Sequence, residues 1–173
     1  MYLISAYFDE ESEKIIRHHM ERIAEKTGNR FMIDNHVPPH MTISSIEARS
    51  ENILIPSFSS LTRKLKSGDI KVVSTGQMFP YVFYLTPVLN EYLTDMSQLV
   101  YDAYKNVPET AISKYYKPGS WLPHITVAKT LSKEQMQQAF RVMQNRFSVF
   151  DARIVRLGLS RVNPHEDIVT KVL

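Results

Sequence analysis

The sequence contains the heptapeptide Trp121-Leu122-Pro123-His124-Ile125-Thr126-Val127 and, upstream of it, the similar hexapeptide Pro38-Pro39-His40-Met41-Thr42-Ile43. Each copy has the form Pro-His-x-Thr followed by a β-branched residue. A shuffled chain of this composition would contain roughly 0.02 such tetrapeptides, so two copies are improbable by chance. Because proline restricts the residue before it and is typical of a strand entrance, the pair predicts two related strands.

Strand geometry decides what these two segments present. Residues two apart in a strand project from the same face, so His40 shares a face with Thr42, and His124 shares one with Thr126. The residues between them face the opposite side and can enter a core. Two such faces brought together would form a symmetric site with two acid–base groups and two hydroxyl donors.

The bulk composition limits the classes of protein that this chain can be. Its 173 residues suit one domain or two small fused lobes, and 43% hydrophobic residues are enough for a substantial core. With no cysteine, the sequence excludes disulfides, thiolate metal ligands and a cysteine nucleophile. The apolar segment 1–8 is short and is followed at once by acidic residues, so it predicts a first strand and not a signal peptide. No apolar run has membrane-spanning length, and we expect a cytoplasmic monomer.

The net charge is +3 at pH 7, with an isoelectric point near 9.0. This mild positive excess suits an anionic ligand without identifying it.

Periodicity predicts the same order of elements in each half: strand, helix, His strand, helix, strand, with one extra strand at the end. In the first half the expected segments are a strand at 2–8, a helix ending at Gly28, a loop at 29–39, the strand 40–45, a helix stripe at 54–65 and a strand at 70–74. In the second half they are a strand at 81–85, a helix stripe at 93–103, a loop at 106–120, the strand 124–128, a helix after a capping box at Ser132 and Gln135, and strands at 154–160 and 168–172 joined by a hairpin around Asn163-Pro164.

This order predicts an α+β fold. We expect a single bilobal domain over 1–173, formed by an internal duplication of approximately 1–78 and 79–173. Each lobe would be a mainly antiparallel sheet with helices on its outer face, and the two pseudo-symmetric inner faces would enclose a central cleft. One His-x-Thr strand would enter this cleft from each side.

The paired motif is suited to concerted acid–base chemistry at phosphorus. One neutral imidazole can take a proton from water while the other, protonated, gives a proton to the leaving oxygen. The two threonine hydroxyls can donate hydrogen bonds to non-bridging phosphate oxygens without a metal. In-line displacement needs the acid and the base on opposite sides of the reacting centre, which a pseudo-twofold site provides.

Both motifs resemble the paired motifs of the 2H phosphoesterase superfamily, and in particular its bacterial 2′-5′ RNA ligase and RNA 2′,3′-cyclic phosphodiesterase branch. The resemblance implies a bilobal fold and metal-independent hydrolysis of the 2′,3′-cyclic phosphate of a nucleotide or RNA end, leaving a 2′-phosphate. By this resemblance, His40 and His124 are catalytic, and Thr42 and Thr126 bind phosphate, with no cofactor or metal. Ile43 and Val127 depart conservatively from the Leu or Phe that often follows the threonine.

Two alternatives stay open beside this function. Some members of the superfamily open or join 2′-5′ linkages, so the chain could be a 2′-5′ RNA phosphodiesterase or ligase acting on linear strands. It could also be a nucleotide-binding module without turnover, although the intact His and Thr pairs argue against this. The sequence does not distinguish the base from the acid, because its pseudo-symmetry makes the two histidines equivalent.

Three further residues are candidates for contact with substrate. Trp121 could stack on a base at the cleft rim, or it could anchor the entrance of its strand by burying apolar area. Lys129 could face a phosphate or be solvated. Tyr115 lies in the long loop before the second motif, where aromatic and basic residues could grip a nucleotide.

The remaining histidines have simpler interpretations. The pair His36 and His40 invites a metal interpretation, but the intervening prolines at 38 and 39 exclude the helical spacing of a zinc site. His18 and His19 are predicted on a solvated helix face. His165 is predicted in a turn, without a role.

Overall fold

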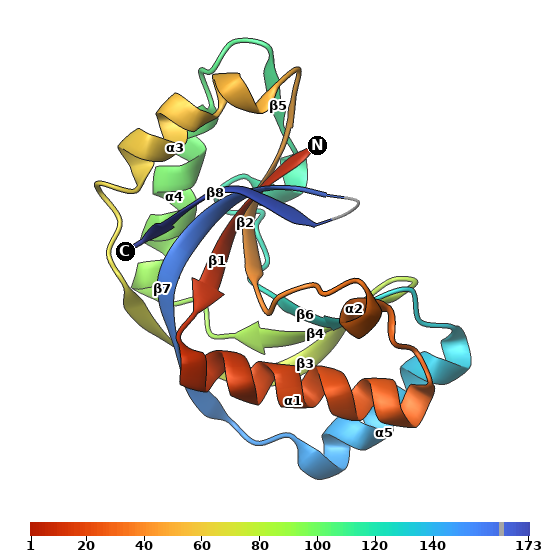
Figure 1. Cartoon of the computed structure of the whole chain (residues 1–173). Coiled ribbons are helices and arrows are strands. Elements are labelled where there is room, and N and C mark those ends of the chain that lie inside the picture. Colours follow the sequence, from red (N-terminus) through yellow and green to blue (C-terminus); the bar gives the residue numbers. More distant parts are fainter. Residues whose placement is uncertain (163–164) are drawn as a thin grey trace.

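The computed structural model describes residues 1–162 and 165–173 and shows an α+β fold with an antiparallel sheet (Figure 1). The first half contains β1 (Tyr2–Phe8), α1 (Glu10–Thr27), α2 (Phe31–Asp34), β2 (Met41–Ala48), η1 (Glu51–Ile53), α3 (Ile55–Leu61) and β3 (Gly68–Met78). The second half contains β4 (Val82–Pro87), α4 (Glu91–Tyr104), β5 (Thr110–Ile112), η2 (Lys114–Tyr116), β6 (Ile125–Ala128), α5 (Lys133–Arg146), β7 (Phe150–Arg161) and β8 (Glu166–Val172).

The helix ends follow from local capping chemistry. At the start of α1 the Asp9 side chain accepts a hydrogen bond from the Ser12 amide, and the helix ends at Gly28 in the left-handed conformation, with φ 69°. The predicted capping box of Ser132 and Gln135 is confirmed at the start of α5, with both reciprocal hydrogen bonds formed. Helix α3 has its proline in the first turn, but it ends before Leu65, earlier than the hydrophobic stripe predicted.

The strands follow a closed path in the order β1-β2-β6-β4-β3-β7, and β7 pairs back with β1. Every pairing on this path is antiparallel. The strands β1, β2 and β3 of the first half correspond to β4, β6 and β7 of the second half. With this correspondence, exchanging the two halves leaves the set of strand pairings on the closed path unchanged. Thus β1–β2 corresponds to β4–β6, and β1–β7 corresponds to β4–β3. The two halves of the chain are therefore joined in one sheet whose pairings have pseudo-twofold symmetry.

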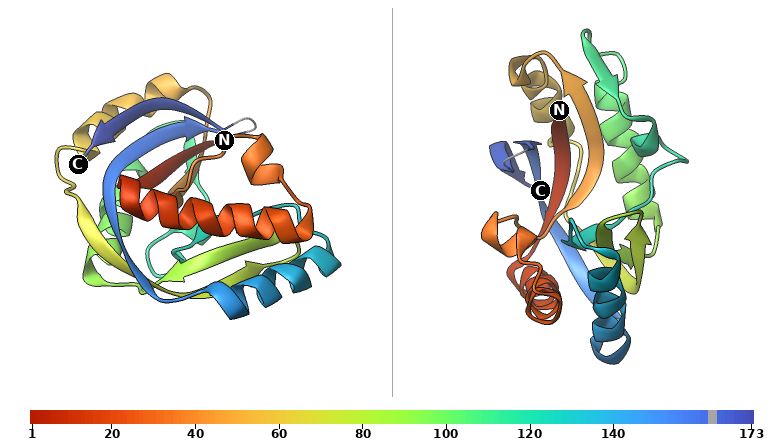
Figure 2. Two further views of the ribbon diagram at one scale, coloured as in Figure 1. Left: turned by 60° about the horizontal axis from the view of Figure 1, so that its bottom comes forward. Right: turned by 90° about the vertical axis from the view of Figure 1, so that its right-hand side faces the viewer.

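The helices obey the same correspondence. Helix α1 packs beside α5 and contacts β6, while α4 packs beside α3 and contacts β2. Figures 1 and 2 show these two helix pairs in different parts of the molecule, with the long curved strand β7 running between them. Side chains from both halves form one buried cluster, which includes Met41 and Ile43 from β2 and Ile125 and Val127 from β6. The predicted core-facing residues of both motifs are thus confirmed.

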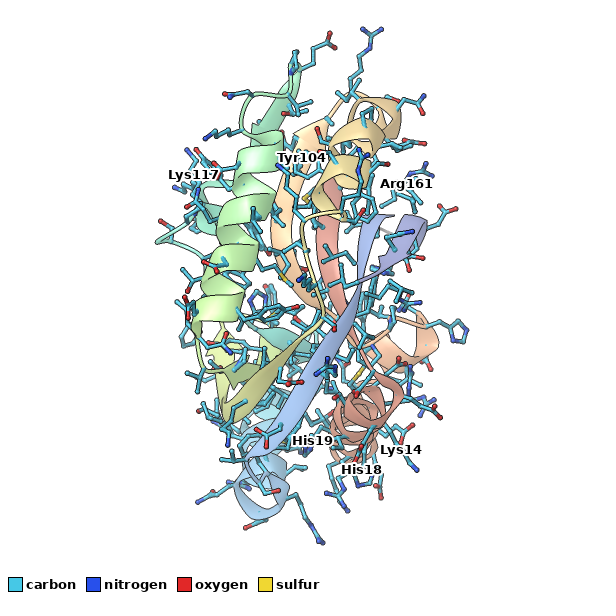
Figure 3. The ribbon with its side chains drawn as sticks, turned by 90° about the vertical axis from the view of Figure 1, so that its left-hand side faces the viewer. Lys14, His18, His19, Tyr104, Lys117 and Arg161 are labelled. Atoms are coloured by element: carbon cyan, nitrogen blue, oxygen red, sulfur yellow. The ribbon has the colours of Figure 1, made fainter. Side chains whose placement is uncertain are left out.

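Three further features differ from the expectations. The expected loop 29–39 contains α2, and the expected loop 106–120 contains β5 and η2. His19, expected on a solvated helix face, is buried with its ring against Phe147 and Phe150, whereas His18 beside it is exposed; Figure 3 shows both on α1. Strands β7 and β8 pair as the expected hairpin, whose turn at Asn163-Pro164 lies outside the described residues.

Among the helices of the described residues, none has the length and apolar character needed to cross a membrane.

Candidate active site

The two His strands meet at one residue pair, Met41 opposite Ile125. In an antiparallel pair, one step along β2 is matched by one step back along β6, so this register places Thr42 opposite His124 and His40 opposite Thr126. The side chains of Met41 and Ile125 are fully buried in the core. Because neighbouring residues of a strand alternate between faces, the four flanking motif side chains project from the opposite face. His40, Thr42, His124 and Thr126 therefore form a quartet around one residue pair.

Neighbouring strands confirm that each histidine shares a face with its threonine. Tyr84 pairs with Thr126 across β4 and β6, and its ring lies 5.5 Å from that of His124 between centroids. In the other half Ser5 pairs with Thr42, and Tyr7, two residues further along β1, lies 6.3 Å from the His40 ring between centroids. Directly paired residues project from the same side of a sheet, so each motif forms one continuous polar face with its neighbours.

The two histidines are held in the same way. Nδ1 of His40 lies 2.8 Å from the carbonyl oxygen of Pro38, and Nδ1 of His124 lies 2.8 Å from that of Leu122. Since a carbonyl can only accept, each contact is a hydrogen bond when Nδ1 carries the proton. Nε2 of each ring is then left to accept a proton in the neutral form and to donate one in the cationic form.

Burial favours the neutral form of both imidazoles. It lowers the pKa of His40 to about 4; the hydrogen bond to Pro38 opposes this shift, and the nearby His165 and His124 add to it. Burial also lowers the pKa of His124, against the effect of the hydrogen bond to Leu122. A phosphate anion placed between the rings would favour their charged forms and reverse these shifts.

A comparison with known families agrees with this geometry. The model of the 2′-5′ RNA ligase superfamily matches residues 11–166, which include both motifs and nearly the whole chain. The chain belongs to this superfamily. No protein with a curated description matches the sequence significantly.

This chain has the same fold as several solved structures, although its sequence identity to them is low. A structure described as a phosphoesterase superposes with a TM-score of 0.65 at 13% identity, covering 99% of this chain and 97% of the other. E. coli LigT complexed with 3′-AMP gives a TM-score of 0.64 at 13% identity with the same coverage. Kluyveromyces marxianus Usb1 with uridine monophosphate gives 0.51 at 12% identity, again covering 99% and 97%.

Of the three other residues predicted to contact substrate, Trp121 is buried, whereas Tyr115 and Lys129 are exposed. Trp121 is only 7% exposed, and its indole Nε1 donates a 3.0 Å hydrogen bond to the carbonyl oxygen of Thr42. This contact favours the anchoring alternative over base stacking, and it ties the second motif to the first. Tyr115 is exposed on η2 beside Lys114, and the Lys129 ammonium lies 5.8 Å from the centroid of the Phe31 ring. Contact of Tyr115 or Lys129 with substrate stays a prediction.

Sequence reasoning missed one histidine beside the quartet. His165 does lie in a turn, as expected, but its ring stacks on that of His40, with centroids 5.1 Å apart and planes inclined by 30°. Tyr7 on β1 lies within hydrogen-bond distance of His165 and donates to Asp167 on β8, whose Oδ1 is 3.7 Å from Nε2 of His165. No local pattern around residue 165 signals this contact, because pairing of β7 and β8 beside β1 brings His165 to the site.

Proposed function

We propose that this superfamily member hydrolyses 2′,3′-cyclic phosphates of nucleotides or RNA ends to 2′-phosphates, with His40 and His124 as its acid–base pair. The observation that carries the proposal is the quartet around Met41 and Ile125, in which both rings keep Nε2 for proton transfer. The structures of LigT with 3′-AMP and of Usb1 with uridine monophosphate support a nucleotide as the ligand class.

The inferred arrangement of the quartet supports an in-line displacement. His40 and His124 lie on one diagonal, and diagonal neighbours of a regular antiparallel pair are about 7–8 Å apart, with their Cβ atoms somewhat closer. One phosphoryl group can then lie between the rings, with the attacking water beside one Nε2 and the leaving oxygen beside the other. Thr42 and Thr126 lie on the other diagonal, from which their hydroxyls would donate to the non-bridging oxygens.

The reaction balances with water as the only co-substrate. A neutral imidazole takes a proton from water as the new P–O bond forms. The protonated imidazole gives its proton to O3′ as the P–O3′ bond breaks. The products are a 2′-phosphate and a free 3′-hydroxyl, and the two histidines have exchanged their protonation states.

We also propose that the halves 1–78 and 79–173 arose by duplication and form two lobes around a substrate cleft. The one-to-one correspondence of strand pairings and helix pairs supports this interpretation. The pseudo-twofold relation would then pass through the Met41–Ile125 pair, at the centre of the quartet.

The test is hydrolysis of the four nucleoside 2′,3′-cyclic phosphates in the presence of EDTA, with separation of 2′- and 3′-phosphate products. We expect the wild type to release the 2′-phosphate. His40→Ala and His124→Ala should each reduce kcat by at least about 100-fold, the usual scale of acid–base catalysis. Thr42→Ala and Thr126→Ala should cost about tenfold, the scale of one lost hydrogen bond. The matched control is His18→Ala on the exposed face of α1, which should retain full activity.

Each other outcome has a distinct meaning. Full activity in either His variant contradicts the paired mechanism, and loss of turnover with EDTA contradicts metal independence. Turnover of 2′-5′-linked dinucleotides but not of cyclic phosphates would establish the linear-strand alternative. Saturable nucleotide binding without hydrolysis of either substrate class would establish the binding module.

A further inference from the structure

Among the described residues, a hydrogen-bonded cluster of polar side chains lies beside His40 on one side of the quartet. Tyr7 is its centre: its hydroxyl contacts Oδ1 of Asp167 and lies 3.1 Å from Nε2 of His165. The Arg156 guanidinium lies over the Tyr7 ring, 4.7 Å from the centroid. The His165 side chain has only 10% of its surface exposed, and its ring stacks on that of His40.

The hydrogen bonds fix the proton on His165. A carboxylate can only accept, so the Tyr7 hydroxyl donates to Asp167. The tyrosine oxygen can then only accept from Nε2 of His165, which must carry a proton. In neutral His165 the other nitrogen, Nδ1, is therefore the site where a second proton is taken up.

The backbone provides the space for this arrangement. A Cβ atom on Gly158 of β7 would lie 2.6 Å from Cε2 of Tyr7, so the tyrosine ring lies directly on a residue without a side chain. In the other half, Gly76 provides the same space under Tyr84, whose ring meets His124 edge-on. Among the described residues, no titratable side chain is hydrogen-bonded to Tyr84. Tyr84 therefore brings no counterpart of His165 to His124.

We propose that His165 is a positioning residue of the site: held by Tyr7 and Asp167, it covers one face of His40 and makes the two motif histidines chemically inequivalent. The inference rests on the proposed function only in taking His40 as a reacting group; the contacts themselves do not depend on it.

The chemical consequence concerns the order in which the histidines take up protons. A proton on His165 opposes a second proton on the ring stacked against it, whereas the T-shaped contact with Tyr84 brings no positive charge that would oppose a proton on His124. Of the other charged groups near the stacked pair, Asp167 favours a proton on either ring, and His124 opposes one on His40. Arg156 lies over the Tyr7 ring and adds a positive charge on that side. We therefore infer that His40 stays neutral to lower pH than His124. Burial is the larger cause of the lowered pKa of His40, and the charge of the stacked His165 adds to it on this side alone.

The test is an NMR titration of the imidazole resonances in the intact protein, which needs no substrate. His165→Phe keeps a ring on His40 but removes the charge, and a unit charge 5.1 Å away shifts a pKa by about half a unit even with the full screening of water. We expect the pKa of His40 to rise by at least this amount in His165→Phe, and further in His165→Ala, where water reaches the uncovered ring. The pKa of His124, measured in the same spectra, should stay unchanged.

A second variant guards against a local folding defect. Tyr7→Phe keeps the ring on Gly158 but removes the hydroxyl that holds His165, so it should shift His40 in the same direction with residue 165 intact. His40 titrating alike in all four proteins would overturn the inference, as would equal shifts of His40 and His124. Where turnover is found, the acidic limb of kcat/KM should move with the pKa of His40 in His165→Phe and stay in place in His18→Phe. Shifts of His40 without turnover of any substrate would reject the proposed function and leave the positioning role standing.

Discussion

Replacing Trp121 with Phe tests how the two motifs depend on each other. Trp121 belongs to the second motif, yet its indole donates to the carbonyl oxygen of Thr42 in the first, at 3.0 Å and in a buried position. Phenylalanine keeps an aromatic ring in the same place but has no donor. The substitution therefore removes this one cross-motif hydrogen bond and part of the apolar volume of the anchor.

The cost can be worked from these two losses. A buried hydrogen bond contributes about 1 kcal/mol to stability, and leaving its acceptor with one partner fewer adds to the penalty. The smaller ring leaves unfilled space, for which about 1 kcal/mol is a reasonable allowance. We expect the free energy of unfolding to fall by about 2 kcal/mol. Because the lost contact fixes the backbone of Thr42, turnover of a cyclic phosphate should also fall, by about tenfold if one hydrogen bond to the phosphate is weakened.

Urea unfolding followed by far-UV circular dichroism is the suitable assay, because Trp121 is the only tryptophan of the chain and the variant loses that fluorescence signal. The matched control is Tyr104→Phe. Tyr104 is also a fully buried aromatic side chain that donates to a carbonyl, that of Leu54, but over 3.4 Å and between α4 and the segment before α3 (Figure 3). This long bond should cost less than about 1 kcal/mol and no activity. A stability loss for Trp121→Phe no larger than for Tyr104→Phe would refute the reasoning.

Three further predictions address burial and charge. Burial lowers the pKa of His19 to about 4. The unfolded chain binds a proton at this histidine below about pH 6.5, whereas the folded protein does not until about pH 4. The contribution of neutral His19 to stability is therefore complete above about pH 6.5 and is lost as the pH falls toward 4. Between pH 7 and pH 5 the wild type should lose about 2 kcal/mol more than His19→Leu in denaturant titrations, and equal losses would contradict this. Gly158→Ala should destabilise the protein by about 1–3 kcal/mol, because the new methyl group displaces the Tyr7 ring, and unchanged melting would show that the ring can move freely. Inorganic phosphate should raise the pKa of both His40 and His124 in an NMR titration, since an anion between the rings favours their charged forms; no shift at saturating phosphate would argue against an anion site.

Local sequence patterns predicted the elements that carry the motifs. Alternation placed Met41, Ile43, Ile125 and Val127 in the core, and this follows from two-residue periodicity alone. Both ends of α1 and the start of α5 followed from capping residues that act within a few positions of the chain. In each case the deciding interaction is formed by residues that are neighbours in sequence.

Non-local contacts decided what the sequence could not predict. Strand β5 forms because Ile112 and its neighbours pair with the end of β2, which no periodicity within 106–120 announces. His19 is buried because Phe147 and Phe150, from the end of α5 and the start of β7, cover that side of α1. The formation of β5 and the burial of His19 both depend on how distant segments pack. The hydrophobic periodicity of one segment does not indicate which other segments it contacts.

The last strand explains why a site built from two similar halves is unequal. In element order, β3 of the first half leads directly into β4, whereas its counterpart β7 is followed by the additional strand β8. Strand β8 pairs with β7, and β7 also pairs with β1. The first residues of β8 therefore lie near β1, on the side of the quartet where His40 lies. Asp167 on β8 and His165 just before it contact Tyr7 on β1, beside His40. The second half has this addition and the first half has none, so the pseudo-twofold relation holds for the quartet and fails at its surroundings. An equal pair of imidazoles would have to rely on the substrate to decide which one is protonated; a pair with His165 on one side has that order built into the protein before substrate binds.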